Sequence, residues 1–339
     1  MCSSDLWNHP SVVMWVPTNE SGFDEAWENG ELYRMFKDAD PSRPVMRTSE
    51  QSPDIFDTHC YDGFWNGPEG KFALTVAAQA ERGRATGKPL TNTEYIENFR
   101  VGKWMGPKPA DISDEQWQRQ VAEGNAQFIL EETEVLRRLG FDGTLPYAWS
   151  AGYVGNLDDP TKEPEFKPNF YALRSGQSPL LASLDLADRH FVPGQKLSVP
   201  VVLCDDAGKA DKVSVDVLLV AGDPGFVWPS ENKQLKIVWH DKLMFARNPD
   251  RLAEKMDPYR LTRNATVPLP SEPGAYWLLA VVKTEGRPEA VSRRPIDVVA
   301  AGRPAAVPRD EIVRIEDFMI EEEAIPTHDS QFMVQQVAQ

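Results

Sequence analysis

"MWVPTNES", residues 14–21, holds the change in polarity that decides how the first part of the chain folds. An apolar run long enough for a buried strand stops abruptly at Asn19 and Glu20. In parallel α/β folds, the side chains that carry out chemistry gather at the carboxyl ends of strands, where the connecting loops converge. The stretch therefore predicts a strand whose end presents an amide and a carboxylic acid to a functional site.

The segments from 10 to about 150 alternate between short apolar runs and stretches with a helical period. Ser113, with Gln116 three residues later, has the pattern of a capping box and predicts where the longest helix begins. Such alternation is typical of parallel strands joined by crossover helices, in part of a (β/α)8 barrel or in an open α/β sheet. The predicted strands are 11–16, 44–49, 54–61, 88–95 and 141–149, and the predicted helices are 24–40, 70–85 and 113–140.

A Pro-rich crossing separates this part from a different pattern. From about 180 to 300 the chain shows alternating strands separated by turns, roughly 8–15 residues apart, which predicts an immunoglobulin-like antiparallel β-sandwich. We therefore expect an α/β part over 1–165, a linker over 166–179 and the sandwich over 180–300. The acidic tail, 301–339, has no core pattern and is expected to be flexible or to lie on the body as an arm.

The composition excludes several classes of function. A length of 339 residues suits two domains, and a formal net charge of −16 disfavours nucleic-acid and membrane-surface partners. No stretch approaches the ~20 apolar residues of a membrane span, and the N-terminus lacks the features of a signal peptide, so localisation stays open. Cys2, Cys60 and Cys204 are too few and too scattered for a disulfide framework or a zinc site, and we expect free thiols and no metal.

Two acids follow predicted strands, Glu20 after 11–16 and Glu94 near the end of 88–95. Glycoside hydrolysis requires two facing carboxyl groups, one to protonate the leaving oxygen and one to attack the anomeric carbon or activate water. A separation of roughly 5–5.5 Å gives retention of configuration and one of roughly 6.5–9.5 Å gives inversion. The sequence leaves that distance open.

The order of three motifs supports this chemistry. "NHPSVVMWVPTNES" (8–21) resembles the acid/base strand of glycoside hydrolase family 2, the family of β-galactosidases, β-glucuronidases and β-mannosidases. "KPLTNTEY" (88–95) is similar to the nucleophile strand of that family, and "DADPSRPV" (38–45) to its link into the fifth barrel strand. The resemblance covers about residues 5–150. It implies the C-terminal half of a (β/α)8 glycosidase barrel, about strands 4 to 8, followed by an accessory β-sandwich.

The resemblance implies a role for each site residue. Glu20 would be the general acid/base and Glu94 the nucleophile of a retaining β-glycosidase, with no metal or organic cofactor. Read without the resemblance, His59 is equally a buried barrel-interior histidine, and Trp149 a core residue. The residues expected to bind substrate are Asn19 at the sugar 2-hydroxyl, His59, Tyr61 beside Glu94, Trp104, and Trp149 under the sugar ring.

The resemblance also predicts that part of the barrel is missing. A family 2 barrel has three strands before the one at 11–16, whereas residue 1 lies only about ten residues before that strand. Five strands do not close such a barrel, and its outer edges would be unpaired. We expect either an N-terminally truncated piece of a longer enzyme, inactive alone unless completed, or a chain whose partner supplies the remainder.

Two alternatives share much of this pattern. One is a non-catalytic carbohydrate-binding or scaffold protein derived from a glycosidase barrel. The other is a hydrolase with the same barrel type, such as a β-mannanase or cellulase. The expected partner is in each case an oligosaccharide, a polysaccharide or another β-glycoside, and the sequence does not decide which sugar or linkage.

Overall fold

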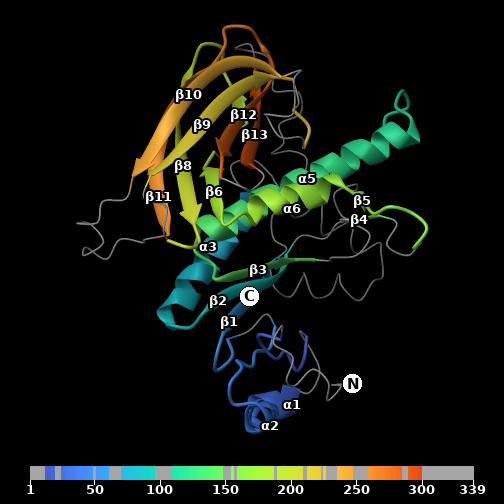
Figure 1. Ribbon diagram of the computed structural model, residues 1–339, viewed down its shortest axis with the longest axis vertical. Coiled ribbons are helices and arrows are strands. Elements are labelled where there is room, and N and C mark those ends of the chain that lie inside the picture. Colours follow the sequence, from blue (N-terminus) through green and yellow to red (C-terminus); the bar gives the residue numbers. More distant parts are fainter. Residues whose placement is uncertain are drawn as a thin grey trace.

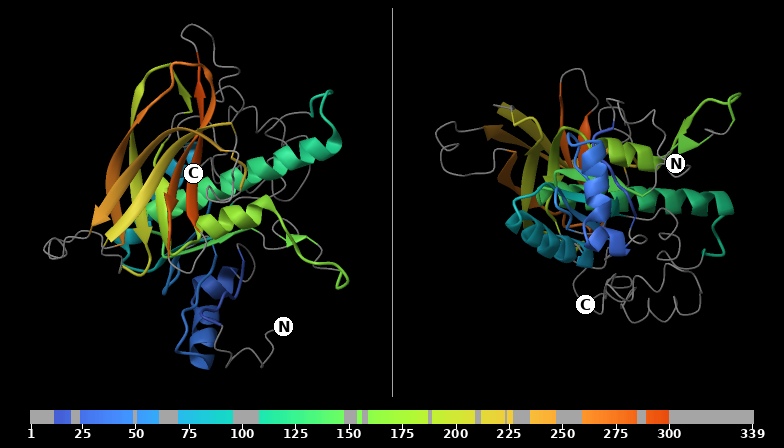
Figure 2. Two further views of the ribbon diagram at one scale, coloured as in Figure 1. Left: turned by 45° about the horizontal axis from the view of Figure 1, so that its top comes forward. Right: turned by 90° about the horizontal axis from the view of Figure 1, so that it is seen from below.

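The computed structural model describes residues 12–19, 24–48, 51–60, 70–95, 108–147, 154–155, 159–186, 189–208, 212–222, 224–226, 235–246, 259–284 and 289–299. The expected tail, 301–339, lies outside these residues. A mixed α/β part precedes a mainly β part along the chain. Helices α5 (Asp114–Arg138) and α6 (Pro168–Gly176) lie next to the sheets of the β part (Figure 1 and Figure 2).

The α/β part contains a parallel sheet in the order β1-β2-β3. A long helix connects each strand to the next, so the chain runs β-α-β-α-β and confirms the alternation predicted from the sequence. Leu90 and Tyr95 of the central strand are buried against the helix layer. The elements are β1 (Phe56–Cys60), α3 (Gly70–Ala85), β2 (Leu90–Tyr95), α5 (Asp114–Arg138) and β3 (Gly143–Pro146).

The strands predicted at 11–16 and 44–49 are reduced to a single parallel bridge between Trp15 and Val45. The helix predicted at 24–40 is two helices, α1 (Asp24–Glu28) and α2 (Glu31–Ala39). Gly30 separates them with a φ of 75°, in the left-handed region. An α-helix cannot continue through that conformation, and glycine adopts it without steric cost.

Helix α5 begins where the sequence predicts. The Ser113 hydroxyl accepts from the backbone N–H of Gln116 at 3.2 Å, and the Gln116 side chain accepts from the backbone N–H of Ser113 at 3.1 Å. This reciprocal pair is the predicted capping box, and it satisfies two backbone donors that the first turn leaves free.

The segment 166–179, expected to be a linker, contains helix α6 (Pro168–Gly176). It follows a short hairpin of β4 (Val154–Gly155) and β5 (Glu165–Phe166). Proline is tolerated in the first helical turn because its missing N–H would have no partner there. Ala172 is buried in the same hydrophobic cluster as α5, so tertiary packing orders this segment as a helix.

The β part consists of two sheets that share one hydrophobic core. Their strand orders are β10-β9-β12-β13-β7 and β11-β8-β6, and every pairing is antiparallel except that of β13 with β7. The immunoglobulin type of this arrangement stays a prediction. The strands are β6 (Leu180–Leu184), β7 (His190–Phe191), β8 (Lys196–Asp205), β9 (Lys212–Ala221), β10 (Lys236–Ala246), β11 (Arg260–Pro268), β12 (Gly274–Val282) and β13 (Ala290–Val298).

Alternation of apolar residues explains this core. In β8, Val199 and Val201 point into it, and in β9 Val215 and Val217 do the same, all four with no exposed surface. Successive side chains of a strand point to opposite faces, so one face of each sheet is apolar. Burying each such side chain stabilises the fold by roughly 1.5–3 kcal/mol.

Cys60 and Cys204 are buried and form no disulfide, and Cys2 lies outside the described residues. Burial raises the pKa of the Cys204 thiol to about 11. In the part of the chain that the structure describes, no helix is both long and apolar enough to cross a membrane. The same part holds no cluster of three or more His, Cys, Asp or Glu side chains suited to a metal ion.

Candidate functional site

Glu94 and His59 lie together at the carboxyl ends of β2 and β1. The two strands pair in parallel, and the register shifts between Thr58 and His59, which places His59 opposite Glu94. A bulge of this kind redirects the side chains beside it. Nδ1 of His59 is 3.6 Å from Oε2 of Glu94, and the Glu94 side chain keeps 20% of its surface exposed. The structure thus brings together two predicted site residues.

A buried polar row, made of Asp57, Thr91 and Thr93, contacts the Nε2 side of the His59 ring. The Asp57 carboxylate accepts from the hydroxyls of Thr91 at 2.5 Å and Thr93 at 2.7 Å. Nε2 of His59 is 3.1 Å from the Thr93 hydroxyl and 3.6 Å from Oδ2 of Asp57, and both side chains are at most 1% exposed. The imidazole therefore lies between a buried carboxylate and the carboxylate of Glu94.

The protons of this row can be assigned from its geometry. The Thr93 hydroxyl has one proton and gives it to Asp57, so its oxygen accepts from Nε2 of His59. In a neutral ring, Nδ1 would then carry a lone pair facing Glu94. A doubly protonated imidazole instead presents an N–H to Glu94. The Nδ1 edge of the ring is thus the part of His59 that faces the Glu94 carboxyl group.

Asn19 follows the bridged segment around Trp15 and is exposed. Its Oδ1 accepts from the Thr48 hydroxyl at 2.9 Å. The bridge between Trp15 and Val45 is parallel, so Asn19 and Thr48 lie on the same side of it, each a few residues further along the chain. An exposed amide fixed by a neighbouring hydroxyl is available to a polar ligand.

Four predicted site residues lie outside the described residues: Glu20, Tyr61, Trp104 and Trp149. The pairing of Glu20 with Glu94, on which the sequence argument depends, therefore stays a prediction. The same holds for the phenol of Tyr61 beside Glu94 and for the two aromatic contacts with sugar.

Sequence reasoning missed Asp57, Thr91 and Thr93. They stand in continuous polar runs, "DTH" (57–59) in β1 and "TNTE" (91–94) in β2, in which Thr58 and Asn92 are buried as well. Such runs are unusual in buried parallel strands, which are commonly apolar on both faces. The polar runs were the available signal.

Residues 3–135 match the family described as "Glycosyl hydrolases family 2, TIM barrel domain". Comparison with curated proteins found no match. The chain is similar to the β-glucuronidase of Parabacteroides merdae, with 14% identity, over 88% of this chain and 37% of that chain, at a TM-score of 0.32.

Two further likenesses are to proteins of Listeria innocua and Bacillus subtilis. The β-glucosidase of the former, in complex with gluconolactone, has 11% identity over 76% of this chain and 40% of that chain, with a TM-score of 0.23. The sporulation control protein Spo0M of the latter has 12% identity over 36% of this chain and 49% of that chain, with a TM-score of 0.24. The chain spans less than half of each of these three proteins, and at such TM-scores the likenesses carry no argument.

A parallel sheet with crossover helices and an acid at a strand's carboxyl end defines an α/β protein. The family match makes the likeness more specific, because residues 3–135 are similar to the TIM barrel domain of glycoside hydrolase family 2.

Proposed function

We propose that this protein is a retaining β-glycosidase in which Glu94 is the nucleophile and Glu20 the general acid/base. The observation that carries the proposal is the position of Glu94. It ends a parallel strand, partly exposed, beside a buried imidazole, within the segment that matches family 2. The substrate class is an oligosaccharide, a polysaccharide or another β-glycoside.

The proposed reaction has two steps. Glu94 attacks the anomeric carbon while Glu20 gives its proton to the leaving oxygen, which forms a glycosyl ester on Glu94. Glu20, now a carboxylate, takes a proton from water, and the water oxygen displaces Glu94 from the sugar. Two inversions at one carbon give net retention.

The other site residues assist these steps. Asn19 hydrogen-bonds the 2-hydroxyl of the sugar, Tyr61 donates to Glu94, and Trp149 forms the floor of the site with Trp104 at its rim. His59, predicted to touch substrate, has a side chain that is 1% exposed. Its neighbours favour a role in holding the Glu94 carboxylate rather than the sugar.

Azide rescue tests the two carboxylates separately. The Glu94→Gly variant of the full chain should lose roughly 10⁴-fold or more in kcat on 4-nitrophenyl β-glycosides. Azide enters the vacated space and attacks from the same side as Glu94, so the product should be an α-glycosyl azide. Glu20→Gly still forms the ester from an activated aryl glycoside, and azide should then give a β-glycosyl azide.

The wild-type chain and a version extended upstream are assayed first against β-galactoside, β-glucuronide and β-mannoside substrates, which also identifies the sugar class. Glu97→Gly, a change at a second acid close to Glu94 in the sequence, is the matched control and should keep wild-type kcat. Sugar binding without hydrolysis by either form would favour the non-catalytic alternative. Azide products of the opposite configuration would reverse or exclude the assigned roles.

A further inference from the structure

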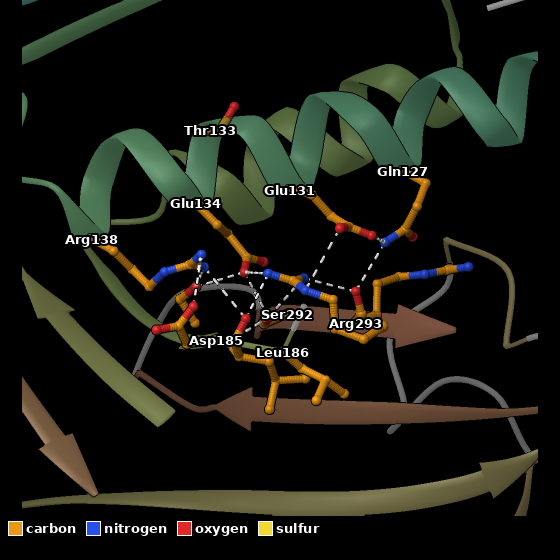
Figure 3. Close-up of polar contacts among 12 residues, drawn as sticks. Gln127, Glu131, Thr133, Glu134, Arg138, Asp185, Leu186, Ser292 and Arg293 are labelled. Atoms are coloured by element: carbon orange, nitrogen blue, oxygen red, sulfur yellow. Dashed lines mark hydrogen bonds and ion pairs between the residues drawn. The ribbon is translucent and has the colours of Figure 1, made fainter. Parts of the chain in front are cut away.

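Helix α5 has two buried faces that meet different parts of the protein. One face contributes Ile129 and Leu136 to the cluster that contains Leu90 and Tyr95 of β2. The other face directs Glu131 and Glu134 toward the β part, whereas Thr133 points away from them (Figure 3). The helix therefore links the strand that carries Glu94 to the two β-sheets.

Buried ion pairs fix the face toward the β part. Oε2 of Glu134 lies 2.7 Å from Nη2 of Arg294 and also accepts from the hydroxyls of Ser183 at 2.7 Å and Ser292 at 2.8 Å. These three partners come from β13 and β6. The side chains of Arg294 and Glu134 are at most 1% exposed.

A second pair lies one helical turn away. Oε2 of Glu131 is 2.7 Å from Nη2 of Arg189 and 3.7 Å from Nε of Arg294. The two acids come from α5 and the two guanidinium groups from the β part, so the charges balance only while both parts remain in place. Rotating or sliding α5 would separate all four charges in a setting without water, which is strongly unfavourable.

The opposite face of α5 contacts the strand that carries Glu94, and a hydrogen bond joins the two. The Thr133 hydroxyl is 2.6 Å from the Tyr95 hydroxyl and 2.6 Å from the carbonyl oxygen of Ile129. The carbonyl only accepts, so Thr133 donates to Ile129 and Tyr95 donates to Thr133. Tyr95 is fully buried and directly follows Glu94.

Helix α6 leaves Thr133 little freedom to move. A Cβ added to Gly176 would lie 2.9 Å from Cγ2 of Thr133, closer than such atoms normally approach. The two helices therefore meet at this glycine, and the Thr133 side chain is held between α6 and β2.

We propose that Thr133 is a positioning residue for Glu94, and that the buried ion pairs of Glu131 and Glu134 hold Thr133 in place. The β part is then a fixed component of the catalytic unit and not a detachable binding module. This inference rests on the proposed role of Glu94.

The first test compares Thr133→Val, which removes the hydroxyl and keeps the volume, with Thr133→Ser, which keeps the hydroxyl. In the full chain we expect Thr133→Val to lower kcat about tenfold with KM unchanged, and Thr133→Ser to stay within about twofold. Tyr95→Phe removes the other partner, and the double variant should be no slower than either single change. Additive losses, or equal kcat in all variants, would overturn the positioning role.

The second test uses hydrogen exchange and needs no activity. Glu134→Gln should speed exchange of the β2 amides, residues 90–95, at least roughly tenfold at temperatures well below unfolding. Asp206→Asn is the matched control, because it removes the partner of Arg137, another residue of α5. The Asp206 side chain is 59% exposed, so in this variant the β2 amides should stay protected. Faster exchange confined to α5, β6 and β13 would contradict the coupling.

The two tests separate failure of the inference from failure of the proposed function. If neither the wild-type chain nor a version extended upstream hydrolyses any β-glycoside, the function is contradicted, while the exchange of β2 still decides whether the ion pairs hold that strand. An active wild type with full activity in Thr133→Val contradicts the positioning role alone. If Glu134→Gln does not fold, exchange of β2 in the Thr133→Val variant replaces that arm and should rise about tenfold.

Discussion

Trp15 donates its indole N–H to Oδ2 of Asp40 at 2.9 Å and so ties the segment before Glu20 to the end of α2. The same carboxylate accepts from the Ser42 hydroxyl at 2.6 Å and pairs with Arg43 at 2.5 Å. Arg43 in turn donates to the carbonyl of Val12 at 2.6 Å. The motif "DPSRP" (40–44) therefore has a structural role, which is to fix the approach to the predicted acid/base.

Replacing Asp40 with Asn should destabilise the fold at neutral pH and make its stability depend less on pH in the acidic range. Hydrogen bonds from Ser42, then Arg43, then Trp15 hold the pKa of Asp40 well below its ordinary value of 3.8. A carboxyl with a lowered folded-state pKa stabilises the fold above that ordinary value, and the stabilisation is lost as pH falls below it. The difference in Tm between wild type and Asp40→Asn should therefore be largest at pH 6–7 and shrink below about pH 4. Asp38→Asn, at an exposed position of α2, should leave Tm unchanged both at pH 6–7 and below pH 4.

Replacing His59 with Gln should lower kcat while leaving the fold intact. Loss of a charge-assisted contact to Glu94 removes roughly 1.5–3 kcal/mol, which corresponds to about 10- to 150-fold in rate if it acts in the transition state. Asp57→Asn should have a similar effect, because it acts through the same imidazole, and the double variant should be less than additive. His240→Gln is the control, since His240 pairs with Asp216 at 3.0 Å on the exposed strand β10 and should not affect kcat. Equal rates in wild type and His59→Gln would show that the imidazole has no part in the reaction.

Replacing Arg294 with Met should cost roughly 3–5 kcal/mol of unfolding free energy, because Glu134 is left buried without its counter-charge. The double variant Glu134→Leu with Arg294→Met should recover a large part of that loss, since it buries no unpaired charge. Urea unfolding at constant pH measures both. Arg119→Met serves as the reference, because Arg119 pairs with Glu123 on α5, the helix that carries Glu134. The Arg119 side chain is 79% exposed, so its ion pair should contribute less than about 1 kcal/mol. A double variant as unstable as Arg294→Met would contradict the pairing argument.

Replacing Glu132 with Gln should stabilise the protein at neutral pH. Burial, and then the charge of Glu131, raise the pKa of Glu132 well above its ordinary value of 4.5. The folded state keeps a proton there that the unfolded state releases, so stability falls as pH rises above about 4.5, up to the folded-state pKa. In Glu132→Gln that fall should disappear, and Tm at pH 7–8 should exceed that of wild type. Glu115→Gln, an exposed change on the same helix, should leave the slope of Tm with pH unchanged above pH 5.

Local patterns predicted much of the fold. The capping box at Ser113, the alternation of valines in β8 and β9, and the position of Glu94 at the end of β2 all depend on residues a few positions apart. Such patterns are visible in a sequence because the periods of helices and strands are set by the backbone alone. Helix α6 was not predicted, because the sequence around it contains prolines and was expected to be a linker.

The sequence by itself therefore determined the alternation of strands and helices, the change to β structure near residue 180, and the strand end that carries Glu94. Only the tertiary structure decided which groups surround these positions. The pairs of Glu131 with Arg189 and of Glu134 with Arg294 join residues 58 and 160 positions apart, and the row of Asp57, Thr93 and His59 spans two strands. A buried charge is stable only beside its partner, and which partner it meets depends on how the layers pack rather than on its neighbours along the chain.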